Sequence, residues 1–84
     1  MSKSVIEMFV INKIREKRIL FQFSQSFMAE LLGVSSGFIG KVESPKYSTK
    51  YNLNHLFKLA IIFDCSPQEF LPNKEEMLNE FKKN

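Results

Sequence analysis

The sequence contains few of the side chains that hold metal ions or disulfides. It has one cysteine, Cys65, and one histidine, His55. A single cysteine cannot close an intramolecular disulfide, and two such ligands are too few for the usual four-ligand metal site. We therefore expect no metal, no cofactor and a reducing, cytoplasmic compartment, with both residues in packing roles.

Long apolar runs are missing as well. The longest, residues 8–11 and 59–63, are four and five residues long. The core of a signal peptide needs about 7 to 15 apolar residues and a membrane span about 20, so the sequence predicts a soluble protein without a membrane partner. It also lacks an acid/base pair, an activated nucleophile and a glycine loop for phosphate, and we expect no enzyme.

Size and composition indicate one small domain. Of the 84 residues, 44% are hydrophobic and 25% are charged, which is typical of globular proteins. Lys and Arg number 12 against 9 Asp and Glu, a net charge of +3. This excess permits an anionic partner without requiring one. The charges after Pro72 cancel, so the whole excess belongs to the part of the chain before the tail.

Helix-start and helix-stop residues predict an all-α chain. Ser4, Ser24 and Ser35 are candidate N-caps, because a serine oxygen accepts a hydrogen bond from a free backbone N–H of the first turn. Gly33 fits the left-handed position that ends a helix, and Pro67 suits the first position of a later one. The predicted helices cover residues 4–19, 25–32, 36–43, 53–63, 67–71 and 74–82.

The expected fold class is a compact five-helix bundle, with helix 74–82 as a sixth, C-terminal helix. Residues 1–72 form the predicted domain and residues 73–84 a tail. The inner side of helix 53–63 should carry Leu53, Leu56, Leu59, Ala60 and Phe63. The apolar side of the tail helix carries Met77, Leu78 and Phe81.

The region from Ser24 to Glu43 carries a recognisable pattern. It consists of Ser24-Gln25, Met28-Ala29, Leu32-Gly33-Val34-Ser35, Ile39 and Val42-Glu43. The pattern resembles the helix-turn-helix of the Cro and phage-repressor type, the Xre family of bacterial DNA-binding domains, over residues 14–71. The resemblance implies a small, homodimeric transcriptional regulator, a repressor, that binds specific sequences of double-stranded DNA. Helix 36–43 would lie in the major groove of each half-site.

The outward side of helix 36–43 agrees with this role. Ile39 and Val42 define its apolar side. The opposite side carries Ser36, Gly37, Gly40 and Lys41. Each exposed glycine in a helix costs about 1 kcal/mol relative to alanine, so two of them indicate a close approach of the backbone to the walls of the groove. The alternative is two neutral surface glycines.

Other contacts are implied by the resemblance. Gln25 corresponds to a glutamine that contacts a phosphate and braces the recognition helix. Lys41 reaches a guanine edge or a phosphate, or it is a solvated helix lysine, and the hydroxyl of Ser36 reads bases permissively. Phe38 either touches a thymine methyl or packs back on Val42.

The segment after Pro45 is rich in side chains that bind phosphate. Lysine, serine and tyrosine contact phosphate oxygens and set the register without reading sequence. In this segment and at Lys41, the sequence predicts three lysines with no opposing surface charge. The complete set of predicted DNA contacts is Gln25, Ser35, Ser36, Gly37, Phe38, Gly40, Lys41, Lys46, Tyr47, Ser48 and Lys50.

Two further pairs concern structure and partners. Arg18 and Glu43 match positions where the family forms a salt bridge between the first helix and the end of the recognition helix. Phe27 and Leu31 lie one turn apart where the family usually has polar residues. They pack on the N-terminal segment or on the tail, or they contact a partner chain. A protein partner defines the alternative function, an interaction module such as the antitoxin of a toxin pair.

Overall fold

The computed structural model describes the backbone of residues 3–82 and the side chains of residues 3–79. Helices alone make up its regular structure, and there is no strand in this range. The elements are α1 (Val5–Leu20), α2 (Gln25–Leu32), α3 (Ser36–Glu43), α4 (Leu53–Ile62), the 3-10 helix η1 (Pro67–Phe70) and α5 (Lys74–Lys82). The predicted all-α class is therefore confirmed. The side chain of Phe81 lies outside the described residues.

Local capping explains where the first helices begin and end. Ser4 and Glu7 form a capping box, in which the Ser4 hydroxyl accepts from the Glu7 N–H at 3.2 Å and the Glu7 carboxylate accepts from the Ser4 N–H at 2.8 Å. Ser24 caps α2 by accepting from the Phe27 N–H. Gly33 ends α2 at φ 82°, a conformation that costs other residues strain.

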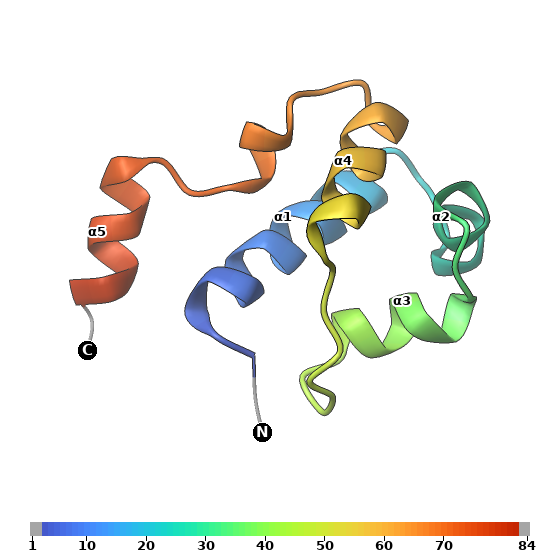
Figure 1. The fold of residues 1–84 in the computed structure, drawn as a ribbon, viewed down its shortest axis with the longest axis horizontal. Helices are drawn as coiled ribbons and strands as arrows, with labels where there is room; N and C mark the ends of the chain where they lie inside the picture. Colours follow the sequence, from blue (N-terminus) through green and yellow to red (C-terminus); the bar gives the residue numbers. More distant parts are fainter. Residues whose placement is uncertain (1–2, 83–84) are drawn as a thin grey trace.

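The core lies between α1, α2, α3, α4 and η1. α1 crosses behind α4, while α2 and α3 pack against each other on one side (Figure 1). The largest fully buried side chains are Phe70, Ile14, Met28, Leu32, Ile39, Leu59 and Val42. Every element except α5 contributes to this set, so the helices that bury them depend on one shared core.

The start of α4 differs from the prediction. Leu59, Ala60 and Phe63 are buried, but Leu53 is 82% exposed. The helical spacing places Leu53 at the edge of the side that carries Leu59 and Phe63. The expectation that Leu53 faces the core is wrong.

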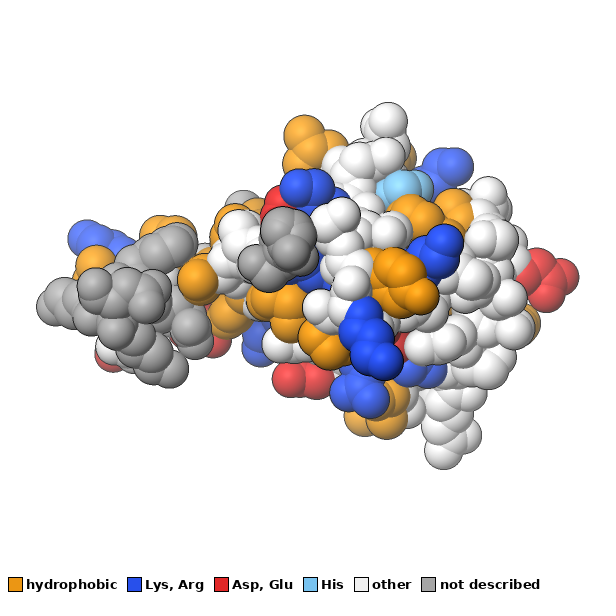
Figure 2. Space-filling view, turned by 90° about the horizontal axis from the view of Figure 1, so that it is seen from below, with side chains coloured by type: hydrophobic (Ala, Val, Ile, Leu, Met, Phe, Trp, Pro, Cys, Tyr) orange, Lys and Arg blue, Asp and Glu red, His pale blue; other side chains and the backbone are white. Residues whose placement is uncertain are grey.

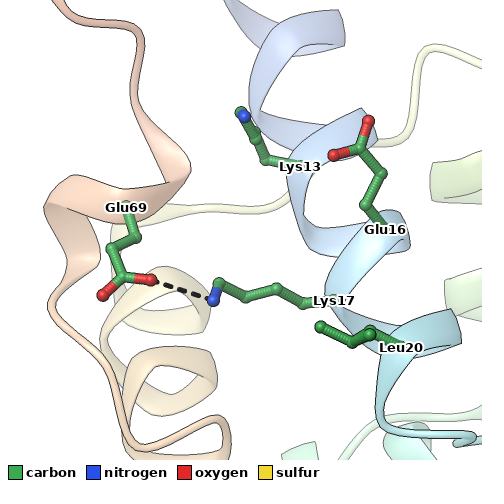
Figure 3. A pocket seen from close by; sticks show the side chains of 5 residues that line it. All are labelled: Lys13, Glu16, Lys17, Leu20 and Glu69. Carbon is green, nitrogen blue, oxygen red and sulfur yellow. Dashed lines mark ion pairs between the residues drawn. The ribbon is translucent and has the colours of Figure 1, made fainter.

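The segment after α4 is a 3-10 helix that is held by both local and distant contacts. The Ser66 hydroxyl accepts from the Gln68 N–H at 3.2 Å, as a helix start at Pro67 requires. Glu69 instead reaches across to α1, where its carboxylate lies 2.9 Å from the Lys17 ammonium (Figure 3). This ion pair ties η1 to α1.

α5 stands apart from the other helices. It lies at one end of the long axis, and α2 lies at the other end (Figure 1). The apolar residues Phe27 and Leu31 on α2 are 45% and 46% exposed. Phe27 contacts the ring of Phe23, but neither the tail nor the described N-terminal residues cover the pair. The expectation that they pack on those segments is wrong.

Candidate nucleic-acid interface

The pair α2 and α3 presents one side of α3 to solvent. Ile39 and Val42 are fully buried, which fixes the rotation of α3 about its own axis. Ser36, Gly37 and Lys41 are exposed on the other side, as the sequence predicts. Ser35 caps the helix by accepting from the Phe38 N–H at 3.0 Å. The N-terminal turn of α3 is therefore both well defined and accessible.

The two glycines of α3 have different surroundings. A Cβ atom on Gly37 would meet only the Ser35 hydroxyl, at 3.9 Å, so this position opens to solvent. A Cβ atom on Gly40 would lie 3.5 Å from the amide oxygen of Gln25, and Gly40 is only partly exposed. The sequence predicts both glycines on the outward side. Gly37 is exposed there, but Gly40 is exposed only in part, because Gln25 covers part of it.

A hydrogen-bonded network joins α1, α2 and the end of α3. The Glu43 carboxylate accepts from Arg18 Nε at 2.8 Å and from Arg18 Nη2 at 2.9 Å, the ion pair that the resemblance implies. Gln25 Nε2 donates to the same carboxylate at 3.1 Å. Arg18 Nη1 also donates to the Phe23 carbonyl at 2.8 Å. Gln25 thus braces the end of α3 through Glu43.

The network is largely shielded from water. The side chains of Arg18 and Glu43 are 12% and 4% exposed. The hydrogen bond to Glu43 raises the pKa of Arg18 above its usual value, so the guanidinium stays charged. Arg15 lies on the outer side of this network, with its Nε 3.7 Å from Glu43. Sequence reasoning missed Arg15, which is an exposed cation beside the end of α3.

The loop after α3 offers most of the expected phosphate-binding side chains. Lys46, Tyr47 and Ser48 are exposed. The Lys41 ammonium lies 5.5 Å from the centre of the Tyr47 ring, which orients both side chains over the start of the loop. These residues lie together at the C-terminal end of α3.

Lys50 differs from the other lysines. Its ammonium lies 2.6 Å from a carboxylate oxygen of Glu7 on α1, and this hydrogen bond lowers the pKa of Glu7. The prediction that the three lysines face no opposing charge is therefore wrong at Lys50. The sequence could not indicate the pair, because α1 and the loop meet only in the tertiary structure.

Lys3 adds a cation that the sequence analysis did not single out. Its ammonium donates to the backbone carbonyls of Ser44, at 2.5 Å, and Lys41, at 3.3 Å. It therefore caps the C-terminal end of α3, where cations are favoured. Figure 2 views this side of the molecule and shows basic side chains beside a broad area of uncharged polar side chains and backbone.

Phe38 is half-buried at the back of α3. Its ring lies 5.1 Å from the His55 ring and 6.2 Å from the Tyr51 ring, centre to centre. It packs against the core as well. The aromatic contact joins α3 to the start of α4, a partner that the sequence analysis did not name. A thymine contact by its edge stays a prediction.

His55 caps α4 in its neutral form. Its Nδ1 accepts from the Asn52 N–H at 3.0 Å, while the Asn52 side chain accepts from the His55 N–H at 2.8 Å. Desolvation by burial lowers the pKa of His55 below 6.5, and the nearby charge of Lys58 lowers it further. A protonated ring could not accept the hydrogen bond from Asn52.

The protein is expected to lose stability as the pH falls through the range where histidine titrates. The unfolded chain takes up a proton near pH 6.5 while the folded His55 resists it, so the unfolded state binds more protons and the free energy of unfolding decreases. Urea unfolding between about pH 7.5 and 5.5 measures this. His55→Gln keeps a capping acceptor without titrating and should give a flat profile. If the free energy of unfolding of the wild type and of His55→Gln changed equally with pH, this pH dependence could not be assigned to His55.

Two other features are not found among the described residues. No group of three His, Cys, Asp or Glu side chains among them could hold a metal ion. None of their helices combines the length and the hydropathy that a membrane span needs.

The fold and this site define the class: a helix-turn-helix domain, with α2 and α3 joined at Gly33 and the outer side of α3 exposed. No family model and no curated protein matches the chain. Among solved structures it is similar to the restriction-modification controller protein C.AhdI from Aeromonas hydrophila, with 28% identity and a TM-score of 0.65. The match covers 76% of this chain and 94% of that one. It confirms the resemblance and the fold class, and it supports a helix-turn-helix regulator in the coarse sense.

Proposed function

We propose that the protein is a homodimeric transcriptional regulator that binds specific sequences of double-stranded DNA, with α3 in the major groove. The observation that carries the proposal is the exposed side of α3, which is held in place by the Arg18, Glu43 and Gln25 network. The similarity to a controller protein supports the same class. It acts as a repressor, because occupying a site is sufficient for repression. This function places it in the cytoplasm.

Each part of the interface has a separate task. Ser36 and Lys41 contact base edges, and Gly37 lets the backbone approach the groove. Phosphates are bound by Gln25, Ser35, Lys46, Tyr47 and Ser48, with Lys50 joining when it leaves Glu7. Because only two polar side chains on α3 reach the bases, we propose that DNA shape supplies a sizeable share of the specificity. A selection of bound sequences from random duplex DNA tests this. A palindromic consensus is expected, whereas random recovered sequences would overturn specific binding.

DNA affinity is expected to depend steeply on salt. If each subunit neutralises roughly four phosphates, the logarithm of the association constant should fall against the logarithm of the salt concentration with a slope of about −7 for the dimer. Lys46→Gln removes one contact per subunit and should reduce the slope by about 2. Lys74→Gln, a control in the tail, should leave it unchanged. DNA affinity that does not change with salt concentration would contradict binding through phosphate contacts.

A second function is favoured by one observation. Phe27 and Leu31 form an exposed apolar pair on α2, away from α5. Such a pair fits a protein partner, as in the antitoxin of a toxin pair, and this role is compatible with DNA binding. The variant Phe27→Ser distinguishes the two functions. If its DNA affinity is unchanged, this surface remains free for a protein partner. A loss of DNA affinity with an intact fold would instead assign the pair to the DNA-binding assembly.

A further inference from the structure

The loop between α3 and α4, residues 44–52, has few hydrogen bonds of its own. In the described part of the chain, no backbone-to-backbone hydrogen bond forms at residues 45–51. The Lys46 N–H donates only to the nearby Ser44 hydroxyl, at 3.2 Å. Yet this loop carries Lys46, Tyr47 and Ser48, which are proposed to bind phosphates. A loop with so few internal bonds depends on contacts with other segments for its order.

The first such contact joins the start of the loop to the N-terminal segment. The Lys3 ammonium donates to the backbone carbonyls of Ser44 and Lys41. Both carbonyls lie where α3 ends, so they carry the partial negative charge of a helix C-terminus and attract a cation. One side chain therefore fixes the direction in which the chain leaves α3.

The second contact joins the end of the loop to the same segment. Glu7 uses both of its carboxylate oxygens: one accepts from the Ser4 N–H at 2.8 Å, and the other lies 2.6 Å from the Lys50 ammonium. Next to Lys50, Tyr51 packs against the core. Lys3 and Glu7 thus bracket the loop, and the start of α1 lies beside it (Figure 1).

We propose that Lys3 and Glu7 are positioning residues that hold this loop in its DNA-binding shape before DNA binds, an inference that rests on the proposed function. Ordering a segment during binding costs free energy, and a loop that is already ordered avoids this cost. Lys3 contacts backbone carbonyls, so it occupies none of the side chains that would bind phosphate. Glu7 forms an exposed ion pair, which is weak enough for Lys50 to exchange it for a phosphate.

The first test measures the order of the loop in the full-length protein without DNA, by NMR relaxation of the amides of Lys46, Tyr47 and Ser48. In the wild type we expect order parameters of about 0.85, as in a rigid backbone. Lys3→Gln removes the ammonium and is expected to lower them below about 0.6. Lys3→Arg keeps a cation that can donate to the same carbonyls and should restore the order. Lys74→Gln, a control in α5, should change nothing.

Glu7→Gln separates the two tasks of the Glu7 carboxylate. A glutamine at this position still accepts from the Ser4 N–H, so the start of α1 stays capped. It removes the charge that pairs with Lys50, and the order parameters of Thr49 and Lys50 should fall. Wild-type order throughout the loop in Lys3→Gln, in Glu7→Gln and in the double variant would overturn the proposal.

The second test measures affinity for the selected duplex at one low salt concentration. Lys3→Gln is expected to weaken binding about 10-fold, while Lys3→Arg should bind like the wild type. In a background of Lys46→Gln with Tyr47→Ala, the same Lys3→Gln change should cost less than about 3-fold, because the contacts that Lys3 positions are already lost. An equal loss in both backgrounds would make Lys3 an independent phosphate ligand and overturn its positioning role.

Failure of the proposed function would give a different result. A protein whose loop is ordered by Lys3 and Glu7 but which binds no duplex DNA would refute the proposed function and still support the positioning of the loop. Full affinity for the selected duplex in Lys3→Gln would overturn the inference and leave DNA binding in place.

Discussion

Arg18→Met is expected to lower the free energy of unfolding by about 3 to 5 kcal/mol. The substitution strands the Glu43 carboxylate, which is 4% exposed and would keep only the amide of Gln25 and the more distant Arg15 as partners. A buried charge without its partner is among the most costly defects in a small domain. Urea or thermal unfolding at pH 7 measures the loss.

Removing both charges should cost much less. In Arg18→Met with Glu43→Met, neither charge remains to be stranded, and buried ion pairs replaced by apolar residues of similar volume are often neutral in stability. Recovery of about half or more of the loss would identify the stranded carboxylate as its cause. Recovery is limited by the Phe23 carbonyl, which loses its hydrogen bond from Arg18 in either variant.

Lys17→Met is the matched control. Lys17 is next to Arg18 on α1 and pairs with Glu69, but the two side chains are 23% and 53% exposed. Exposed pairs contribute about 0 to 1 kcal/mol, so this variant should remain close to the wild type. Equal losses of unfolding free energy for Lys17→Met and Arg18→Met would refute the claim that burial makes the Arg18–Glu43 pair costly to break.

Gly37→Leu is expected to weaken binding to the selected duplex about 1,000-fold, down to the level of non-specific DNA. The position is open, since the Cβ of a side chain there would meet only the Ser35 hydroxyl, at 3.9 Å. It would instead fill the space between α3 and the groove wall. Titration of a labelled duplex at fixed salt measures the loss.

Stability should change in the opposite direction. Leucine favours a helix over glycine by roughly 1 kcal/mol, so Gly37→Leu is expected to fold at least as well as the wild type. Gly37→Ala adds only a methyl group and should lose much less affinity. Asn12→Leu is a control at an exposed position of α1. Full affinity in Gly37→Leu would eliminate α3 as the helix in the groove.

Much of the site could be predicted from local sequence. Ser24, Gly33 and Ser35 act on backbone groups within four residues of themselves, so the bounds of α2 and the start of α3 follow from residue type. The exposed side of α3 follows from the spacing of Ile39 and Val42. The resemblance added the pairing of Arg18 with Glu43, which no local rule could provide.

What local sequence could not decide is which distant side chain covers a given surface. Gly40 and Lys50 were predicted to be free, but Gln25 and Glu7 reach them from other helices. Leu53 was predicted to be covered, but it remains 82% exposed at the start of α4.

The sequence by itself determined the helices, their order and their polar and apolar sides, because caps and helical periodicity act within one or two turns. Only the tertiary structure decided which side remains uncovered. Covering a side chain requires segments far apart in the chain to meet, and that depends on how all the helices share one core. The exposed side chains of Leu53, Phe57 and Ile61 on α4 are one consequence.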